Sequence, residues 1–179
     1  LSNEGILSEI DNGPQWLSET IIVRSSSHLE DSAESSLAGH FTSVPGVKGS
    51  GATESAITTV RESLQPVDEN DLIFFQPFLS DALRSGVVFT RDPSTGSPYY
   101  IINYDAKTGS TDSVTSGSGS GLETAVISKY CDRVDLDWQQ ALVDLCEELE
   151  RLFDNDSLHI EFAFDESEKL YLFQVRPLV

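Results

Sequence analysis

The sequence predicts an α+β fold in which antiparallel hairpins pack against two or three helices. The chain has 179 residues and 39% hydrophobic residues, including nine Phe and five Tyr, which is enough to form a core. Short apolar runs end at Gly-, Pro- and Ser-containing turns, as strands do, and two longer stretches repeat apolar residues at helical spacing. Together these observations indicate an α+β sandwich of one domain or two small subdomains.

The first part of the chain predicts two strands and one helix. Residues 17–23 form a buried strand that ends at Arg24, where a polar loop begins. Thr53 can cap a helix over residues 54–64, whose apolar residues fall on one stripe. A further strand is expected over residues 71–79.

The second part predicts two hairpins and the strongest helix. Asp135 or Asp137 can cap this helix, whose apolar stripe includes Leu142 and Leu152 and which ends at Phe153. The other expected segments are a hairpin of residues 85–90 and 99–104, a Gly- and Ser-rich segment at 107–121, a short strand at 126–127, and a final hairpin of residues 159–164 and 169–177.

The charge balance restricts the possible partners. The formal charge is −19, from 30 acidic and 11 basic residues. Nucleic-acid binding needs clustered Lys and Arg, so the composition argues against that class. A bound nucleotide would have to be held by local Arg residues, backbone N–H groups and a metal ion. No apolar run approaches membrane-spanning length, so no membrane association is expected.

The cysteines and the chain start give two further expectations. Cys131 and Cys146 form no metal-binding motif, and Cys146 falls in a helical pattern. A buried thiol is expected there, which favours a reducing compartment such as the cytoplasm. The sequence begins at Leu1 and contains no Met, so we expect it to be a piece of a longer protein.

The final hairpin carries three polar side chains among apolar neighbours. Glu161 interrupts the first run, while Gln174 and Arg176 are two residues apart in the second and should point to one face. A carboxylate and an amide can offer oxygen atoms to Mg²⁺, and Arg binds phosphate. The pattern indicates a nucleotide site. The alternative is that Glu161 is only an ion-pair partner of Arg176.

A second candidate region follows the first predicted strand. Arg24 precedes three Ser residues, so its guanidinium can bind phosphates while hydroxyls and loop amides donate hydrogen bonds. The alternative is a surface Arg paired with Glu30 and Asp31. The segment from Ala38 to Val44, which includes Gly39, can likewise form a mobile lid over phosphates or an ordinary turn.

These motifs and others occur in a defined order along the chain. They are Val23-Arg24-Ser25-Ser26 with Glu30-Asp31, Ala38-Gly39, Ser85-Gly86-Val87-Val88-Phe89-Thr90 with Asp92-Pro93 and Thr95-Gly96, Glu161, and Gln174-Val175-Arg176-Pro177. The order resembles the ATP-grasp nucleotide-binding domain of phosphoenolpyruvate synthase and pyruvate phosphate dikinase, to which rifampicin phosphotransferases and glucan water dikinases are related.

The resemblance covers about residues 17–178 and divides the chain into four parts. They are an N-terminal remnant at 1–16, the Arg loop, lid and central strands at 17–104, a family loop at 105–121, and a helix with the C-terminal hairpin at 122–179. It implies ATP and Mg²⁺ as ligands. Arg24 and Arg176 would contact the phosphates as catalytic arginines, and Glu161 and Gln174 would hold Mg²⁺ and ribose or phosphate oxygens.

The resemblance also implies roles for a lid, an adenine contact and separate domains. The backbone at Gly39, Ser43 and Val44 would form the lid, and Gln76 would lie beside the adenine. ATP would phosphorylate a His on a separate swivelling domain, which then serves phosphoenolpyruvate or pyruvate at a third domain.

The sequence departs from the family pattern at several positions. The family has an ATP-binding Lys in a further N-terminal portion, but here no Lys precedes Lys48. The family has a Gly-Leu-Gly-Glu-like stretch before a Ser-Gly pair, and residues 109–117 keep only one Gly, an acid and the Ser-Gly pair. His28, His40 and His159 lack the Gly-rich setting of the phosphocarrier and are expected to be ordinary histidines. The chain is therefore expected not to complete a turnover alone.

Two other interpretations remain open. A degenerate or isolated non-catalytic module is favoured by the acidic balance and the missing Lys, whereas retention of Arg24, Glu161, Gln174 and Arg176 favours a working site. A structural α+β domain without a ligand would make the motif order accidental. The final phosphoryl acceptor, whether pyruvate, phosphate, a glucan or an antibiotic, depends on domains outside this sequence.

Overall fold

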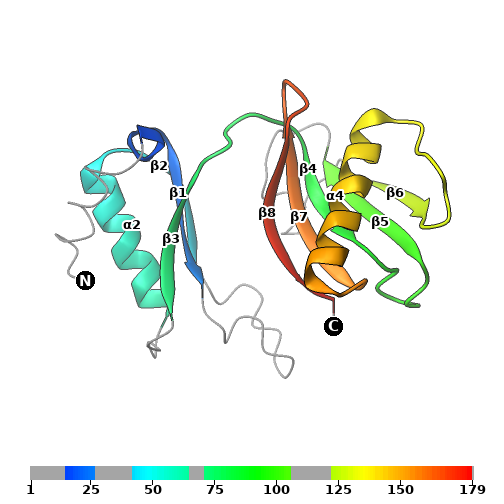
Figure 1. The fold of residues 1–179 in the computed structure, drawn as a ribbon. Helices are drawn as coiled ribbons and strands as arrows, with labels where there is room; N and C mark the ends of the chain where they lie inside the picture. Colours follow the sequence, from blue (N-terminus) through cyan, green and yellow to red (C-terminus); the bar gives the residue numbers. More distant parts are fainter. Residues whose placement is uncertain (1–14, 27–41, 65–70, 106–121, 179) are drawn as a thin grey trace. The chain divides into compact units, whose positions relative to one another are not determined.

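A computed structural model describes residues 15–26, 42–64, 71–105 and 122–178. Within these ranges the chain is α+β, with two antiparallel sheets and two α-helices, as expected (Figure 1). The chain divides into two compact units, Leu1–Phe78 and Leu79–Val179, which are called the N-terminal and C-terminal units below. None of the helices in the described ranges is long and apolar enough to cross a membrane.

The N-terminal unit is a three-stranded sheet with one helix packed against it. Its strand order is β2-β1-β3, formed by β1 Ile21–Ser26, β2 Ser43–Val47 and β3 Leu72–Pro77. Helix α2, Ser50–Ser63, covers one face. The core cluster is made of aliphatic residues from the helix and two of the strands, Ile21, Val23, Val47, Ala56 and Val60.

Two boundaries in this unit differ from the sequence prediction. Strand β1 begins after a short 3-10 helix, η1 Gln15–Ser18, and it continues to Ser26, so Arg24 lies inside the strand. The N-cap of α2 is Gly49, with a φ of 84°, rather than Thr53. The Thr53 hydroxyl instead donates to the Gly49 carbonyl oxygen at 2.9 Å from within the first turn. A glycine at positive φ can start the helix without any side-chain cap, which is why the cap prediction was wrong.

The C-terminal unit is a five-stranded antiparallel sheet covered on one face by helix α4, Asp137–Phe153 (Figure 1). The strand order is β6-β5-β4-β7-β8. The strands are β4 Ala82–Phe89, β5 Tyr99–Asp105, β6 Leu122–Ser128, β7 Leu158–Asp165 and β8 Leu170–Pro177. Both predicted hairpins are present, as the pairs β4–β5 and β7–β8, and β7 also pairs with β4.

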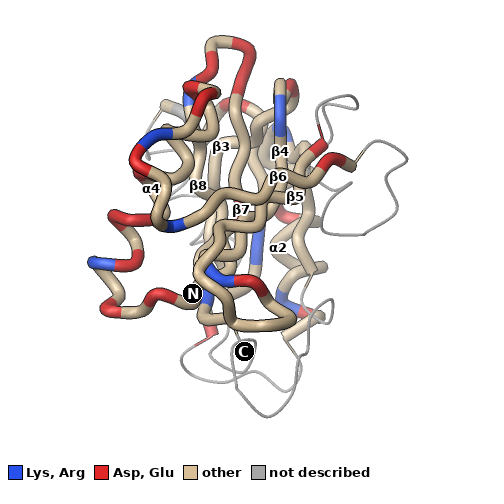
Figure 2. Tube along the Cα trace, turned by 90° about the vertical axis from the view of Figure 1, so that its right-hand side faces the viewer, with Lys and Arg blue, Asp and Glu red and all other residues tan. Residues whose placement is uncertain are grey.

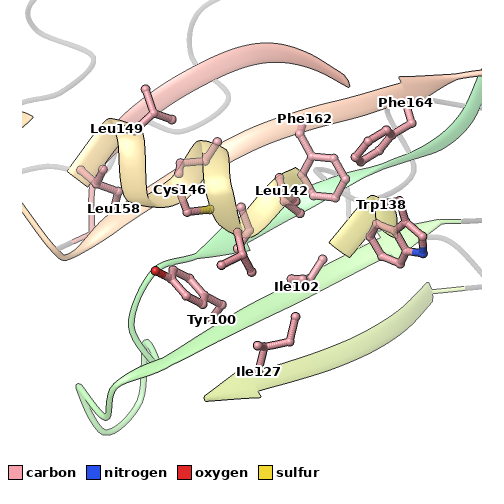
Figure 3. Packing of buried hydrophobic residues seen from close by; sticks show 13 residues of the cluster. Tyr100, Ile102, Ile127, Trp138, Leu142, Cys146, Leu149, Leu158, Phe162 and Phe164 are labelled. Carbon is pink, nitrogen blue, oxygen red and sulfur yellow. The ribbon is translucent and has the colours of Figure 1, made fainter. Parts of the chain in front are cut away.

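The main core lies between α4 and the sheet, where large aromatic and aliphatic side chains meet (Figure 3). The cluster comprises Val88, Tyr100, Ile102, Ile127, Trp138, Leu142, Val143, Cys146, Leu149, Leu158, Ile160, Phe162 and Phe164. The Cys146 thiol is free and buried as expected, and burial raises its pKa.

The structure also corrects the predicted limits of α4. Its N-cap position is Leu136, which makes no side-chain cap, so neither Asp135 nor Asp137 has that role. Asp137 is the first helical residue, where a negative charge suits the helix dipole. Leu152 is 72% exposed, so the buried stripe ends a turn earlier than predicted, at Leu149.

Candidate functional site

The C-terminal hairpin places four polar side chains on the sheet face that points away from α4. In β7, Ile160 belongs to the core beneath α4, so the adjacent residues His159 and Glu161 face the other way. Glu161 lies directly opposite Gln174 of β8, and His159 lies directly opposite Arg176. The register therefore puts Glu161, Gln174 and Arg176 on one face.

A β-bulge in β8 makes this arrangement possible. The β7–β8 register shifts between Glu161 and Phe162, where β8 has one additional residue, Phe173. Leu170 packs against the core on the α4 side, and strict alternation from Leu170 would place Gln174 on that side as well. The additional residue shifts the alternation by one, so Gln174 lies beside Glu161 on the opposite face.

Arg176 is held by a hydrogen bond within this hairpin. Its Nε donates to Nδ1 of His159 at 2.7 Å, and the ring of Phe89 stacks on the imidazole with centroids 4.9 Å apart. Burial, followed by the positive charge of Arg176, lowers the pKa of His159 to about 4. The imidazole is therefore neutral at pH 7, and its Nδ1 lone pair accepts the hydrogen bond.

Glu161 and Gln174 have polar atoms that a ligand can use. Both side chains are partly buried, and neither has a hydrogen bond or ion pair to the parts of the chain that the structure describes. The alternative pairing of Glu161 with Arg176 is not formed, because Arg176 contacts His159 instead. Within the described ranges, no group of three or more His, Cys, Asp or Glu could hold a metal ion. A cation at Glu161 would therefore need ligands of other kinds, such as the side-chain oxygen of Gln174 and the oxygen atoms of a bound molecule.

The N-terminal unit carries a second set of predicted residues on one sheet face. Arg24 pairs with Ser43 of β2 and with Phe74 of β3, so the three residues form a row across the sheet. The guanidinium carbon of Arg24 lies 6.0 Å from the centroid of the Phe74 ring, within the range of a cation–π contact. Gln76 lies on the same face, opposite Ile22.

Two of the predicted lid residues belong to a strand. Ser43 and Val44 begin β2, and the Val44 side chain packs against the core of the N-terminal unit. A lid would therefore have to begin before Ser43. Several other predicted positions lie outside the described residues, namely Gly39, residues 106–121 of the family loop, His28, His40, and the alternative Arg24 partners Glu30 and Asp31.

Sequence reasoning missed the role of His159 as a partner of Arg176. The signal was present in the spacing, because His159 and Glu161 are two residues apart in one run and Gln174 and Arg176 are two apart in the other. A hairpin that pairs one member of each set pairs the other as well.

Most of the other charged residues in the described part of the C-terminal unit are Asp or Glu (Figure 2). A cavity of about 620 Å³ near the end of α4 is lined by Glu147, Glu150, Arg151, Asp154, Asn155 and Asp156. Two of these carboxylates are already paired, Glu150 with Lys129 and Asp156 with Arg91. None of the predicted nucleotide-binding residues lines this cavity.

No protein-family model matches the chain, and no curated protein matches it. The functional assignment therefore depends on the residues of the two sheets and on their register.

Proposed function

We propose that this chain is the ATP-binding part of a cytoplasmic phosphotransferase similar to phosphoenolpyruvate synthase and pyruvate phosphate dikinase. One observation carries the proposal. A carboxylate, an amide and a guanidinium share one face of the β7–β8 hairpin, with Glu161 directly opposite Gln174 and Arg176 two residues further along β8. These are the residue types that the resemblance assigns to Mg²⁺ and to the phosphates.

The donor set is suited to Mg²⁺ that is bound together with phosphate. Mg²⁺ prefers hard oxygen ligands and is commonly held by one or two carboxylates, with water and substrate phosphates completing its shell. Glu161 and the side-chain oxygen of Gln174 would supply the protein's share. When bound, the ion would reduce the charge of the triphosphate, which a chain of formal charge −19 otherwise repels.

The resemblance assigns a phosphate contact to one arginine in each unit. Arg176 is already fixed through its Nε, and Arg24 lies in a row with the Ser43 hydroxyl, a second donor for phosphate oxygens. Positioning and charge neutralisation account for most of the catalysis of phosphoryl transfer. Gln76, which shares a sheet face with Arg24, is the proposed adenine-side residue.

The phosphoryl acceptor in this proposal is a His on a separate domain that serves a phosphoenolpyruvate- or pyruvate-type domain. His159 is poorly suited to be that acceptor, because Nδ1 accepts a hydrogen bond from Arg176 and Nε2 is buried. The chain alone is therefore expected to bind MgATP without turning it over.

Calorimetric titration of the chain with ATP, with and without Mg²⁺, tests the proposal. We expect magnesium-dependent binding that Arg176→Ala weakens about tenfold or more, because hydrogen bonds to charged groups contribute about 1.5–3 kcal/mol. Arg133→Ala is the matched control. It removes a positive charge at an exposed position on the C-terminal unit, outside the predicted site, and should bind as the wild type does.

Two results would contradict the proposal. A folded sample that binds no MgATP would reject the nucleotide role and favour the non-catalytic module. An equal loss in Arg176→Ala and Arg133→Ala would show that the affinity depends on net charge rather than on the hairpin site.

A further inference from the structure

The hydrogen bond between His159 and Arg176 determines which guanidinium atoms a ligand can use. An Arg side chain has one N–H on Nε and four on its two Nη atoms. His159 Nδ1 accepts from Nε at 2.7 Å, whereas the Nη atoms have no partner in the parts of the chain that the structure describes. The terminal edge of the guanidinium is therefore the part left for an anion.

The imidazole is held by its own neighbours. It stacks on Phe89 with an interplanar angle of 27° and lies opposite Arg176 in the register of the hairpin. The Nε–H of Arg176 can only donate, so Nδ1 of His159 is the unprotonated acceptor and the ring proton lies on Nε2. The position of the acceptor is thus set by packing from β4 and by backbone pairing.

The Nε2 atom of the same imidazole is buried at a cost in stability. Nε2 of His159 is buried and has no hydrogen-bond partner among the described residues. A buried donor without an acceptor destabilises a fold, and an apolar ring at this position would avoid the loss. What His159 provides that an apolar ring cannot is the acceptor for Arg176.

We propose that His159 is a positioning residue, which holds Arg176 through Nε so that both Nη groups are presented to the phosphates of the nucleotide. This inference rests on the proposed function. It specifies an end-on contact through Nη1 and Nη2, instead of a side-on contact through Nε and one Nη. Bidentate contacts of this kind fix the orientation of a phosphate as well as its affinity.

Variants at position 159 of the full chain test this role. His159→Phe keeps an aromatic ring for Phe89 and removes the acceptor, while His159→Asn retains an acceptor oxygen close to the Nδ1 position. We expect His159→Phe to weaken MgATP binding about fivefold to tenfold, as the loss of one oriented hydrogen bond does, and His159→Asn to recover most of the affinity. His159→Leu, a second variant without an acceptor, should behave like His159→Phe and guards against a folding defect of either one.

A double-mutant cycle separates positioning from a general structural effect. If His159 acts through Arg176, then His159→Phe should cause no further loss of affinity in an Arg176→Ala background.

A measurement without nucleotide tests the hydrogen bond itself. The Arg176 Nε–H signal in a proton–nitrogen spectrum, identified by its absence in Arg176→Ala, should be protected from exchange in the wild type and in His159→Asn but not in His159→Phe. Thermal unfolding of each variant without nucleotide shows which are folded.

The outcomes distinguish this inference from the proposed function. Wild-type affinity in both His159→Phe and His159→Leu, or an equal loss in the Arg176→Ala background, would overturn the positioning role and leave MgATP binding intact. An Nε–H signal that stays protected in His159→Phe would overturn it as well. No MgATP binding by the wild type would overturn both proposals.

Discussion

The two units both carry their candidate residues on the sheet face away from the helix, but they hold their arginines in different ways. Arg176 donates a 2.7 Å hydrogen bond to a neutral, partly buried imidazole. Arg24 has a ring contact at 6.0 Å and no hydrogen bond to other described residues. Hydrogen bonds are directional, whereas a cation over a ring tolerates displacement. The comparison indicates that Arg176 is preorganised and that Arg24 can adjust to a ligand.

The hydrophobic cores of the two units also differ in the size of their side chains. The C-terminal core contains Trp138, Phe162 and Phe164, whose rings make edge contacts with centroids 5.9 Å apart. The N-terminal core cluster is made of smaller aliphatic residues. Large aromatic side chains bury more area and pack in preferred geometries, so the candidate residues of the C-terminal unit lie over the larger apolar core.

The largest expected effect is a loss of stability on replacing a glycine of the C-terminal unit, which we compare with the same replacement in the N-terminal unit. A Cβ at Gly86 in β4 would lie 2.2 Å from the Asn103 carbonyl oxygen, which is backbone and cannot move without disturbing the sheet. We expect Gly86→Ala to lower the free energy of unfolding by about 2–3 kcal/mol. Gly51 in α2 has no atom within 4 Å of such a Cβ, so Gly51→Ala should be neutral or stabilising by about 0.5–1 kcal/mol. Urea unfolding measures the free energy of unfolding of both variants. Equal changes in the two would show that Gly86 is not required by close backbone packing in β4.

A smaller effect on stability should follow from the titration of His159. Among the described residues, no histidine contacts Arg24, so this effect concerns the C-terminal unit. The pKa of His159 is about 4 in the folded chain and about 6.5 when unfolded. Above pH 6.5 the ring is neutral in both states and its contribution to stability is fully present. As the pH falls from 6.5 towards 4, the unfolded state takes up the proton first, so the free energy of unfolding decreases.

We expect this decrease to be about 1–2 kcal/mol after allowance for solvent screening. Urea unfolding of the wild type and of His159→Phe at pH 7 and pH 5 measures it, because carboxylates that titrate in this range are common to both proteins. A wild type and variant with the same pH dependence would show that His159 titrates normally.

The smallest expected effect compares conservative changes at the two arginines. Lys keeps the charge but lacks the Nε–H that contacts His159, so Arg176→Lys should weaken MgATP binding about tenfold. Arg24→Lys keeps a cation near Phe74 and should weaken binding less than about threefold. Calorimetry of the two variants measures the difference. A larger loss at Arg24 would reverse the assignment of the preorganised arginine.

The elements that could be predicted were those with a local signal. Apolar periodicity located α4, and the alternation of polar and apolar residues placed Gln174 and Arg176 on one face, as the register shows. The start of α2 could not be predicted because it depends on the backbone conformation of Gly49 rather than on a capping side chain. The exposure of Leu152 depends on what packs against the last turn of α4, which helical periodicity does not specify.

The candidate site was predicted as a set of residue types but not as a network. Glu161, Gln174 and Arg176 were identified from their chemistry, and their register is consistent with that expectation. The bulge at Phe173 could not be predicted, because it depends on which β7 residue lies opposite which β8 residue. The bond from Arg176 to His159 follows from the residue spacing only once Glu161 is known to lie opposite Gln174. Alternation with period 2 does not fix the register of two strands, and a shift of one residue would move each side chain of a strand to the opposite face.

The hairpin origin of the C-terminal candidate residues has a consequence for how the chain folds. Strands β7 and β8 are joined by a tight turn, in which the Asp165 carboxylate accepts hydrogen bonds from the backbone N–H groups of Ser167 and Lys169. Contacts across such a hairpin have low sequence separation, and closing the short loop costs little chain entropy. Glu161 and Gln174 can therefore come together on their own strand pair, before distant segments such as β6 have joined the sheet.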